Sequence, residues 1–214
     1  MSKPTLKLDW CSHEAAKYAV EKWHYSRRMP VGKLTRVGVW ESGRFIGCVL
    51  FDRGANRNIG SPYGLSAVEV CELVRVALNR HECPVSRILA VAIRFLRRSA
   101  PGLRLIVSYA DPEQGHAGTI YQAGSWVYTG KNDSPQSQRV EVGKVIHKRS
   151  LFARDGTTAG SVCTKVLWKH KYLMPLDGDM RERVTPLSKP YPKRATSVDS
   201  DAPANHAGKG GVLS

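Results

Sequence analysis

The chain has 214 residues, of which 42% are hydrophobic and 24% charged, values that suit one globular domain better than two. Its 33 Lys and Arg against 18 Asp and Glu give a formal net charge of +15, an excess that favours a polyanionic partner such as nucleic acid. No apolar run approaches the roughly 18 residues of a membrane span, and no signal-peptide core is evident, so neither a membrane protein nor a secreted one is indicated.

The five cysteines show no paired C-x-x-C spacing. Neither a zinc module nor a disulfide framework is therefore expected. Reduced thiols suit a protein of the cytoplasm.

The first predicted element is a helix that Ser12 can cap, because apolar residues recur with helical spacing as far as Trp23. This helix should end before Pro30. Residues 34–40 and 45–51 are strand-like, and the short polar turn between them predicts a β-hairpin. The second strand is apolar on both faces, which places it inside a sheet.

Residues 53–66 are rich in Gly, Asn and Pro and are predicted to form a loop. Its arginines and Tyr63 could contact a nucleic-acid backbone and stack on a base, and an ordinary solvated loop is the alternative. A third strand is expected over residues 68–78. A helix with an apolar stripe begins near residue 84 and ends at the Pro-Gly pair 101–102.

The next stretch predicts a buried strand at Leu105–Val107 that stops at Asp111, because the following proline cannot donate to a sheet. A short helix around residues 116–123 carries Tyr121, and residues 126–128 restart a strand. A carboxylate at the carboxyl end of a buried strand, with a phenol one short helix later, lies where α/β folds place their chemistry.

Two more strands are expected at residues 139–147 and 162–168, bridged by a turn at Asp155. The order of elements predicts an α/β (α+β) fold with a mixed central sheet flanked by helices, parallel where a helix intervenes. Residues 1–188 would form this single domain. Residues 189–214 are small, polar and rich in Pro and Gly, which predicts a basic and mostly disordered tail.

Three places could carry chemistry. Ser86 and Arg87 open a helix whose N-terminus could bind phosphate, although neither a dinucleotide-binding nor a P-loop motif is present. The His24–Tyr25 pair could bind a metal or exchange protons, as could the carboxylate and phenol described above. For each place a purely structural role, as a packed turn, a helix end or a buried ring, is the alternative.

Several stretches together resemble a known family, the Mom proteins of Mu-like bacteriophages, which are DNA-modification enzymes with a fold like that of the Gcn5-related N-acetyltransferases. The similar stretches are collinear and cover residues 24–34, 38–55, 72–78, 84–97 and 103–128, followed by KHKYLMPLD and PYPKR. The resemblance implies conversion of adenine N6 in DNA to N6-(methylcarbamoyl)adenine, also called acetamidoadenine. Such a substituent would protect phage DNA, because restriction enzymes read the adenine amino group in the major groove.

The resemblance also implies the residues of the site. Those for catalysis, and for binding an iron ion, are His24, Tyr25, Asp111 and Tyr121. The implied cofactor is acetyl-CoA, although the glycine-rich phosphate-loop signature of acyltransferases is missing here. Its arm would lie along Arg75, Val76, Ala77 and Leu78, with its phosphates at Ser86 and Arg87. We expect the four catalytic side chains to converge in one pocket beside the helix terminus at Ser86.

The implied partner is double-stranded DNA with a flipped adenine, because N6 is stacked and paired inside a duplex. Candidate phosphate contacts are Arg27, Arg28, Arg53, Arg57, Lys189, Lys193 and Arg194. No membrane partner is expected, and the oligomeric state, including a dimer, is open.

Ordinary transfer from a thioester attacks its carbonyl carbon and would give N6-acetyladenine. The family product instead joins N6 to the former methyl carbon, so an activating device such as a redox metal is expected. Two other functions fit the sequence. One is a conventional N-acetyltransferase of a small amine or a protein lysine, and the other is a DNA-binding protein without enzymatic activity.

Overall fold

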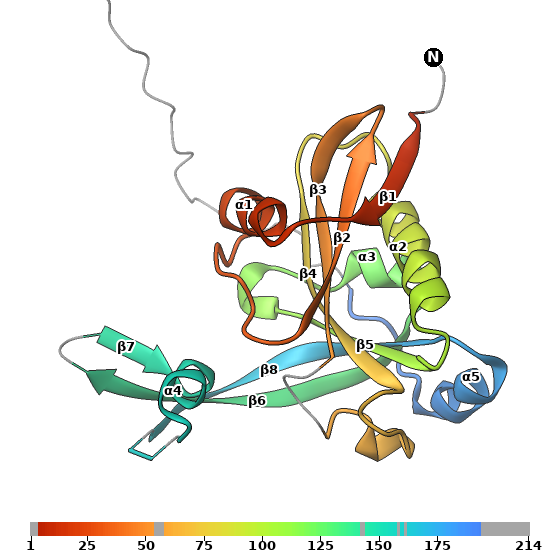
Figure 1. The fold of residues 1–214 in the computed structure, drawn as a ribbon. Helices are drawn as coiled ribbons and strands as arrows, with labels where there is room; N and C mark the ends of the chain where they lie inside the picture. Colours follow the sequence, from red (N-terminus) through yellow and green to blue (C-terminus); the bar gives the residue numbers. More distant parts are fainter. Residues whose placement is uncertain (1–3, 54–57, 142–143, 158, 161, 194–214) are drawn as a thin grey trace, which may run out of the picture.

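One mixed sheet organises the molecule, and a computed structural model describes it over residues 4–53, 58–141, 144–157, 159–160 and 162–193 (Figure 1). Within these residues the sheet has eight strands in the order β1-β2-β3-β4-β5-β8-β6-β7. Their bounds are β1 Leu6–Trp10, β2 Leu34–Glu41, β3 Arg44–Asp52, β4 Val70–Leu78, β5 Leu105–Ala110, β6 Val127–Glu141, β7 Lys144–His147 and β8 Val162–Pro175. The mixed sheet confirms the predicted fold class.

Helices cover both faces of this sheet. They are α1 His13–Trp23, α2 Val85–Ser99, α3 Thr119–Gln122, α4 Lys148–Asp155 and α5 Gly178–Val184, with 3-10 turns η1 Ser61–Tyr63, η2 Pro112–Gln114 and η3 Thr185–Leu187. α1 packs against Cys48 and Leu50, whereas α2 packs against Val49 and Phe51. Because successive strand residues face opposite ways, the two helices lie on opposite faces. Among the residues described, no helix is long and apolar enough to span a membrane.

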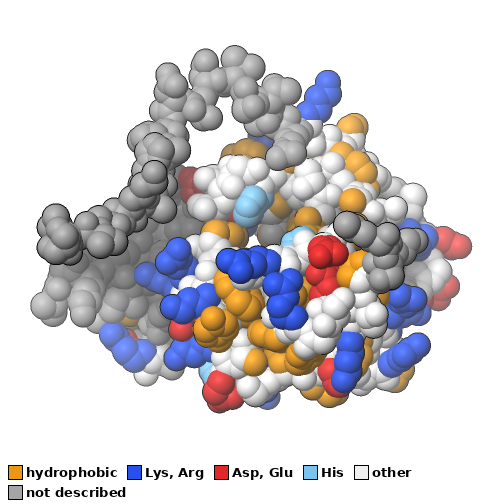
Figure 2. Space-filling model, turned by 90° about the horizontal axis from the view of Figure 1, so that it is seen from above, with side chains coloured by type: hydrophobic (Ala, Val, Ile, Leu, Met, Phe, Trp, Pro, Cys, Tyr) orange, Lys and Arg blue, Asp and Glu red, His pale blue; other side chains and the backbone are white. Residues whose placement is uncertain are grey.

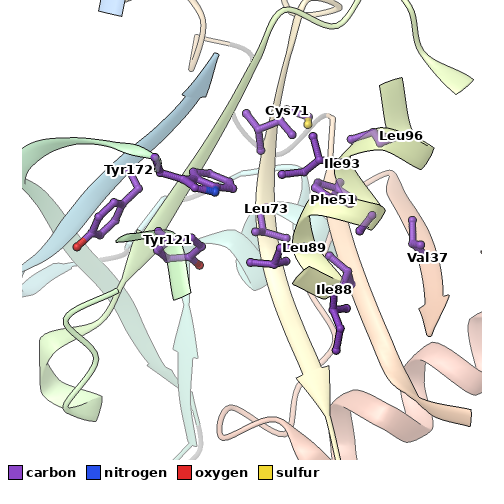
Figure 3. Close-up of a cluster of buried hydrophobic side chains, with 14 of the residues drawn as sticks. Val37, Phe51, Cys71, Leu73, Ile88, Leu89, Ile93, Leu96, Tyr121 and Tyr172 are labelled. Atoms are coloured by element: carbon purple, nitrogen blue, oxygen red, sulfur yellow. The ribbon is translucent and has the colours of Figure 1, made fainter. Parts of the chain in front are cut away.

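The main core lies under α2 and extends to the aromatic residues beside α3. Figure 3 shows Phe51, Leu73 and Ile93 packed together, with Tyr121 and Tyr172 at the edge of the same cluster. This arrangement ties the short helix that carries Tyr121 to the body of the sheet. The position of that phenol is therefore set by core packing.

Several local predictions are confirmed. Ser12 caps α1, because its hydroxyl accepts the amide of Ala15. β2 and β3 form the expected hairpin, with Ser42 and Gly43 both at positive φ (49° and 80°), the conformation of a type I′ turn. α2 connects β4 to β5, and these two strands are parallel.

Three predicted elements differ from the structure. β1 was not expected, because only its two leucines pack against the core. The helix expected over residues 116–123 is reduced to α3, because Gly118 adopts positive φ (77°) just before it. The later strands are longer than expected, since β6 starts at Val127 and β8 runs to Pro175, and α4 replaces the simple turn at Asp155.

The parallel strands β4 and β5 separate partway along their length. They pair from Val70↔Leu105 to Leu73↔Ser108 and no further. A β-bulge at this point makes Val74 an extra residue in β4, which bends that strand away. The Ser108 hydroxyl lies 2.8 Å from the Leu73 carbonyl oxygen where the strands part. The separation leaves a wedge-shaped gap between the ends of β4 and β5.

The first part of the predicted tail is packed against the domain. The Lys189 amide donates to the Tyr128 carbonyl at 2.8 Å, and the Tyr191 hydroxyl donates to the Trp126 carbonyl at 2.6 Å. The Tyr191 ring also stacks on Tyr172, with 6.4 Å between centroids. Residues 189–191 are therefore held against the domain by these contacts. Residues 194–214 lie outside the described part of the chain.

Candidate active site

A cavity of about 510 Å³ opens in the wedge between β4 and β5. It brings together three segments that are distant in sequence: the end of α1, the part of β4 beyond the bulge, and the loop from β5 to α3. The lining residues are 23–25, 73–76, 109–110 and 115–121. Its volume is in the range of pockets that hold small molecules.

His24 stands at the C-cap position of α1 and faces this cavity. Its Nδ1 accepts the Ser26 amide at 3.1 Å and lies 2.8 Å from the Ser26 hydroxyl. Because Nδ1 is an acceptor, the ring proton is assigned to Nε2. Burial lowers the pKa of His24 to about 4, and the nearby charges of Arg75 and His116 act in the same direction. His24 is therefore neutral near pH 7, with its other nitrogen a donor.

Tyr25 and His116 form the rim of the cavity with His24. The Tyr25 ring lies 4.3 Å from the His24 ring and meets the edge of His116 at 5.2 Å between centroids. Half of Tyr25 is exposed (50%), and partial burial raises the pKa of its phenol. His116 was not among the predicted site residues, although it follows the Asp111 turn so closely that this proximity could have identified it.

Tyr121 forms the buried end of the site. Its hydroxyl lies 2.8 Å from the Ser108 hydroxyl, at the point where β4 and β5 separate. Its ring packs between Trp126 and Tyr172, each with its centroid 5.0 Å away. Burial raises the pKa of Tyr121 to about 12 despite the opposing contact with Ser108. The group is thus a protonated phenol near neutral pH.

Asp111 lies beside the cavity and is absent from its lining. One carboxylate oxygen accepts the Glu113 amide at 3.1 Å, and the other is 3.6 Å from the Lys169 amine. The carboxylate is close enough to Tyr25 to raise the pKa of that phenol. The structure therefore brings three of the four predicted catalytic residues into one cavity and places Asp111 next to it.

Only some of the residues predicted to hold the cofactor line the cavity. Arg75 and Val76 line the cavity. Ala77 is fully buried in the core under α1, and Leu78 packs against the core on the other face. Ser86 and Arg87 lie in the first turn of α2 and are not among the residues that line the cavity, so their contact with a cofactor stays a prediction.

A carboxylate of the protein occupies the loop that precedes α2. Glu41, only 4% exposed, accepts the amides of Glu82 and Cys83, both at 2.8 Å. Burial alone would raise the pKa of Glu41, but these hydrogen bonds outweigh it and lower that pKa. The two amides that a phosphate could have used at this loop are therefore engaged by Glu41.

The four residues implied as iron ligands do not present a ligand set. The Nδ1 of His24 is held by Ser26, the Tyr121 hydroxyl contacts Ser108, and Asp111 contacts Lys169. Within the described ranges, no group of three or more His, Cys, Asp or Glu could hold a metal ion. The arrangement of these side chains gives the iron prediction no support.

Of the predicted DNA contacts, those that the structure describes are all exposed: Arg27, Arg28, Arg53, Lys189 and Lys193. Arg57 and Arg194 lie outside the described residues. Arg27 and Arg28 come two and three residues after Tyr25, which lines the cavity. Tyr63 is buried (6% exposed) and cannot stack on a base as the loop composition suggested.

The sequence model of the Mom protein family matches residues 5–193 of this chain. The methylcarbamoylase Mom of Escherichia phage Mu is 27% identical over 134 residues, which are 60% of this chain and 55% of the phage protein. The match thus spans about half the length of that relative.

Two solved acetyltransferases show how far the likeness extends in structure. The aminoglycoside acetyltransferase AAC(6')-Ib, in complex with coenzyme A and kanamycin, superposes with a TM-score of 0.48 at 11% identity, covering 84% of this chain and 98% of that one. The spermidine N-acetyltransferase SpeG of Vibrio cholerae gives 0.48 at 10%, covering 85% and 97%. Family membership therefore rests on the sequence match.

Proposed function

Because the chain belongs to the Mom protein family, we propose that it is a DNA-modifying enzyme that converts adenine N6 to N6-(methylcarbamoyl)adenine. The name of the phage Mu relative, methylcarbamoylase, suggests this reaction. The observation that carries the proposal is the cavity between β4 and β5, which gathers His24, Tyr25 and Tyr121 from distant parts of the chain. Phage DNA modified in this way would resist restriction enzymes that read adenine N6.

The cavity suits a flipped base. An adenine must leave the duplex before its N6 can react, and enzymes that flip bases hold them by stacking and by hydrogen bonds. Tyr25 offers a half-exposed ring at the rim, and the Nε2 proton of His24 offers a donor to a ring nitrogen of the base. Arg27 and Arg28 would contact the flanking phosphates.

The cavity also suits the arm of an acyl-coenzyme A. Beyond Leu73, β4 has no pairing with β5, so the edge of residues 74–76 faces the cavity instead of a neighbouring strand. An extended chain that carries amides can pair with such an edge as an added strand would. Acetyl-CoA, when bound, would supply the two-carbon unit, while the carboxamide nitrogen would come from a nitrogen donor and the bond from N6 to the former methyl carbon would require a two-electron oxidant.

The protonation states assign roles to the side chains. His24 and Tyr121 both carry a proton near neutral pH, so each acts as a hydrogen-bond donor that orients the base or the acyl oxygen. The remaining acceptor for the N6 proton is the Asp111 carboxylate, held beside the cavity by Lys169. These roles use only groups that line or adjoin the cavity.

A second function, conventional N-acetylation, is favoured by one observation. The cavity lies where β4 and β5 separate, so the free edge of β4 could hold a thioester arm, and acyl transfer from a thioester to an amine needs no metal. Its product on DNA would be N6-acetyladenine, which differs from the family product by one NH unit. The same cavity could also accept another small amine.

One experiment distinguishes these functions. The protein is expressed in bacteria, plasmid DNA is hydrolysed to nucleosides, and deoxyadenosine is examined by mass spectrometry. A methylcarbamoyl group on deoxyadenosine supports the proposal, and an acetyl group supports the second function. Unmodified deoxyadenosine at every level of soluble protein contradicts both activities on DNA.

A pair of tyrosine variants then tests the site. Tyr121→Phe should lower DNA modification at least ~100-fold, in the range for losing a positioned hydrogen-bond donor. Tyr191→Phe is the control, because the Tyr191 hydroxyl also makes one hydrogen bond, to the Trp126 carbonyl at 2.6 Å, but lies outside the cavity. Each variant should lose about 1 kcal/mol of unfolding free energy, since each loses one hydrogen bond of the folded protein. Equal modification by both variants contradicts a catalytic role for Tyr121.

A further inference from the structure

Strands β6 and β8 continue well beyond the rest of the sheet. The pairing of β8 with β5 ends at Ala110↔His170. The pairing of β6 with β8 goes on from Lys131↔His170 to Gln138↔Val162. Figure 1 shows the resulting two-stranded ribbon, with β7 and α4 at its far end, projecting from the domain. We call residues 131–141, 144–157 and 162–169 the arm.

The arm meets the apolar clusters of the domain at its root. The clusters that the structure describes include Val127 and Tyr128 from β6, and Tyr172 and Leu173 from β8. All four residues precede or follow the arm, which therefore extends from the edge of these clusters.

The arm is strongly basic. It contains eight Lys and Arg against three Asp and Glu, so it supplies five of the fifteen net positive charges of the chain. At its root, the Lys131 side chain is exposed and its amine lies 4.2 Å from the centre of the Trp168 ring. An antiparallel ribbon with such an excess matches the charge and the groove dimensions of a DNA duplex.

The root of the arm contacts the site directly. The Lys169 amine lies 3.6 Å from the Asp111 carboxylate, at the start of the loop that lines the cavity. The Tyr128 hydroxyl lies 2.9 Å from the His170 ring, which joins the two strands where they leave the domain. The direction of the arm is thus fixed relative to the cavity.

We infer that the arm is a DNA-binding element, which lies along the duplex beside the flipped adenine and holds its phosphates. This inference rests on the proposed function in one respect, namely that the partner is duplex DNA. It adds a binding surface distinct from the two arginines that follow Tyr25. Figure 2 shows that Lys and Arg side chains also gather on the neighbouring described surface.

The test compares two full-length triple variants with equal loss of charge. The arm variant carries Lys144→Gln, Lys148→Gln and Arg149→Gln. The control carries Arg94→Gln, Arg97→Gln and Arg98→Gln, three exposed arginines of α2 on the body of the domain. Binding to a fluorescent duplex is measured by anisotropy over a range of salt concentrations.

The arm variant should bind at least ~10-fold more weakly than the unaltered protein, and the slope of log K against log salt should fall by up to about 3, close to one unit per lost phosphate contact. The α2 variant should bind almost as tightly as the unaltered protein. Unchanged binding by the arm variant overturns the inference, and so does an equal loss in both variants, which would show that only total charge matters.

A charge-preserving variant distinguishes the effect of lost charge from the effect of substituting these three side chains. Lys144→Arg, Lys148→Arg and Arg149→Lys keep the positive charges and should retain binding, whereas loss of binding here would overturn the inference. The readout is affinity for unmodified DNA and does not depend on catalysis. A protein that binds through its arm but leaves adenine unmodified would contradict the proposed function alone.

Discussion

At the scale of single residues, the local contacts of His24 decide its chemistry. The backbone turn after α1 directs the Ser26 amide onto Nδ1, so one nitrogen of the ring is fixed as an acceptor. Burial of the ring lowers the pKa of His24, and its interactions with Arg75 and His116 act in the same direction. These features keep the imidazole neutral near pH 7, so that it carries its one proton on Nε2 and can donate a hydrogen bond from there.

The pH dependence follows from the same contacts. The pKa of His24 is about 4 in the folded protein against 6.5 for a free side chain, so the unfolded chain binds a proton more readily. The free energy of unfolding should therefore fall as the pH drops from about 6.5 towards about 4. Above about pH 6.5 the ring is neutral in both the folded and the unfolded protein, so the free energy of unfolding no longer depends on its titration.

Two measurements check this prediction. Titration of the His24 ring protons by NMR should give a midpoint near 4. Denaturant unfolding at several pH values should show a smaller decline in acid for His24→Gln, which removes the titrating group, than for the unaltered protein. A midpoint near 6.5, or identical declines, would show that the imidazole is not held in its neutral form.

At the scale of elements, the loop from β5 to α3 sets the shape of the cavity. Gly118 lies in this loop at φ 77°, and a Cβ atom there would lie 2.4 Å from the Tyr172 ring. Gly115 has a similar φ of 68°, but a Cβ atom there would meet nothing within 4 Å. Substitutions at the two positions therefore distinguish backbone strain, which acts at both glycines, from a steric clash, which is expected only at Gly118.

Gly118→Ala should destabilise the protein by roughly 2 to 4 kcal/mol, because it combines left-handed strain with a clash in a packed region. Gly115→Ala should cost only about 1 kcal/mol, since strain acts alone there. Denaturant unfolding measures both values. DNA modification should fall further in Gly118→Ala, and equal unfolding energies would contradict the proposed contact with Tyr172.

Elements with local signals were predictable from the sequence. The hairpin turn at Ser42 and Gly43, the cap at Ser12 and the amphipathic helix α2 each depend on residues close together in the chain. β1 and the full lengths of β6 and β8 depend on partners far away, and their own patterns were too weak to show them. The predicted order of elements therefore held best in the middle of the chain.

The candidate site also has one part that local sequence indicates and another that depends on distant contacts. Asp111 and Tyr121 are close in sequence, and a strand end followed by a short helix was enough to suggest them. The meeting of His24 with Tyr121 depends on the β-bulge at Val74, which no local pattern indicates. The His24–Tyr25 pair was a candidate from its residue types, and the family resemblance joined it to Asp111 and Tyr121.

At the scale of the whole molecule, the C-terminal segment sets the extent of the domain. Composition predicted a tail from residue 189, because small, polar and Pro-rich residues bury little apolar surface. Tyr191 is the exception, since its hydroxyl and ring both contact the domain. Removal of residues 189–214, which include Tyr191, should therefore destabilise the protein more than removal of residues 194–214 alone.

Two truncations test this boundary. Deletion of residues 194–214 should leave the free energy of unfolding within about 0.5 kcal/mol, because their composition gives little to bury. Deletion of residues 189–214 should lower it by roughly 1 to 3 kcal/mol, since the Tyr191 hydrogen bond and its ring contact with Tyr172 are lost. Denaturant unfolding measures both, and Tyr191→Ala in the full chain should reproduce most of the larger loss. Equal stability of the two truncations would place the boundary of the domain before Lys189.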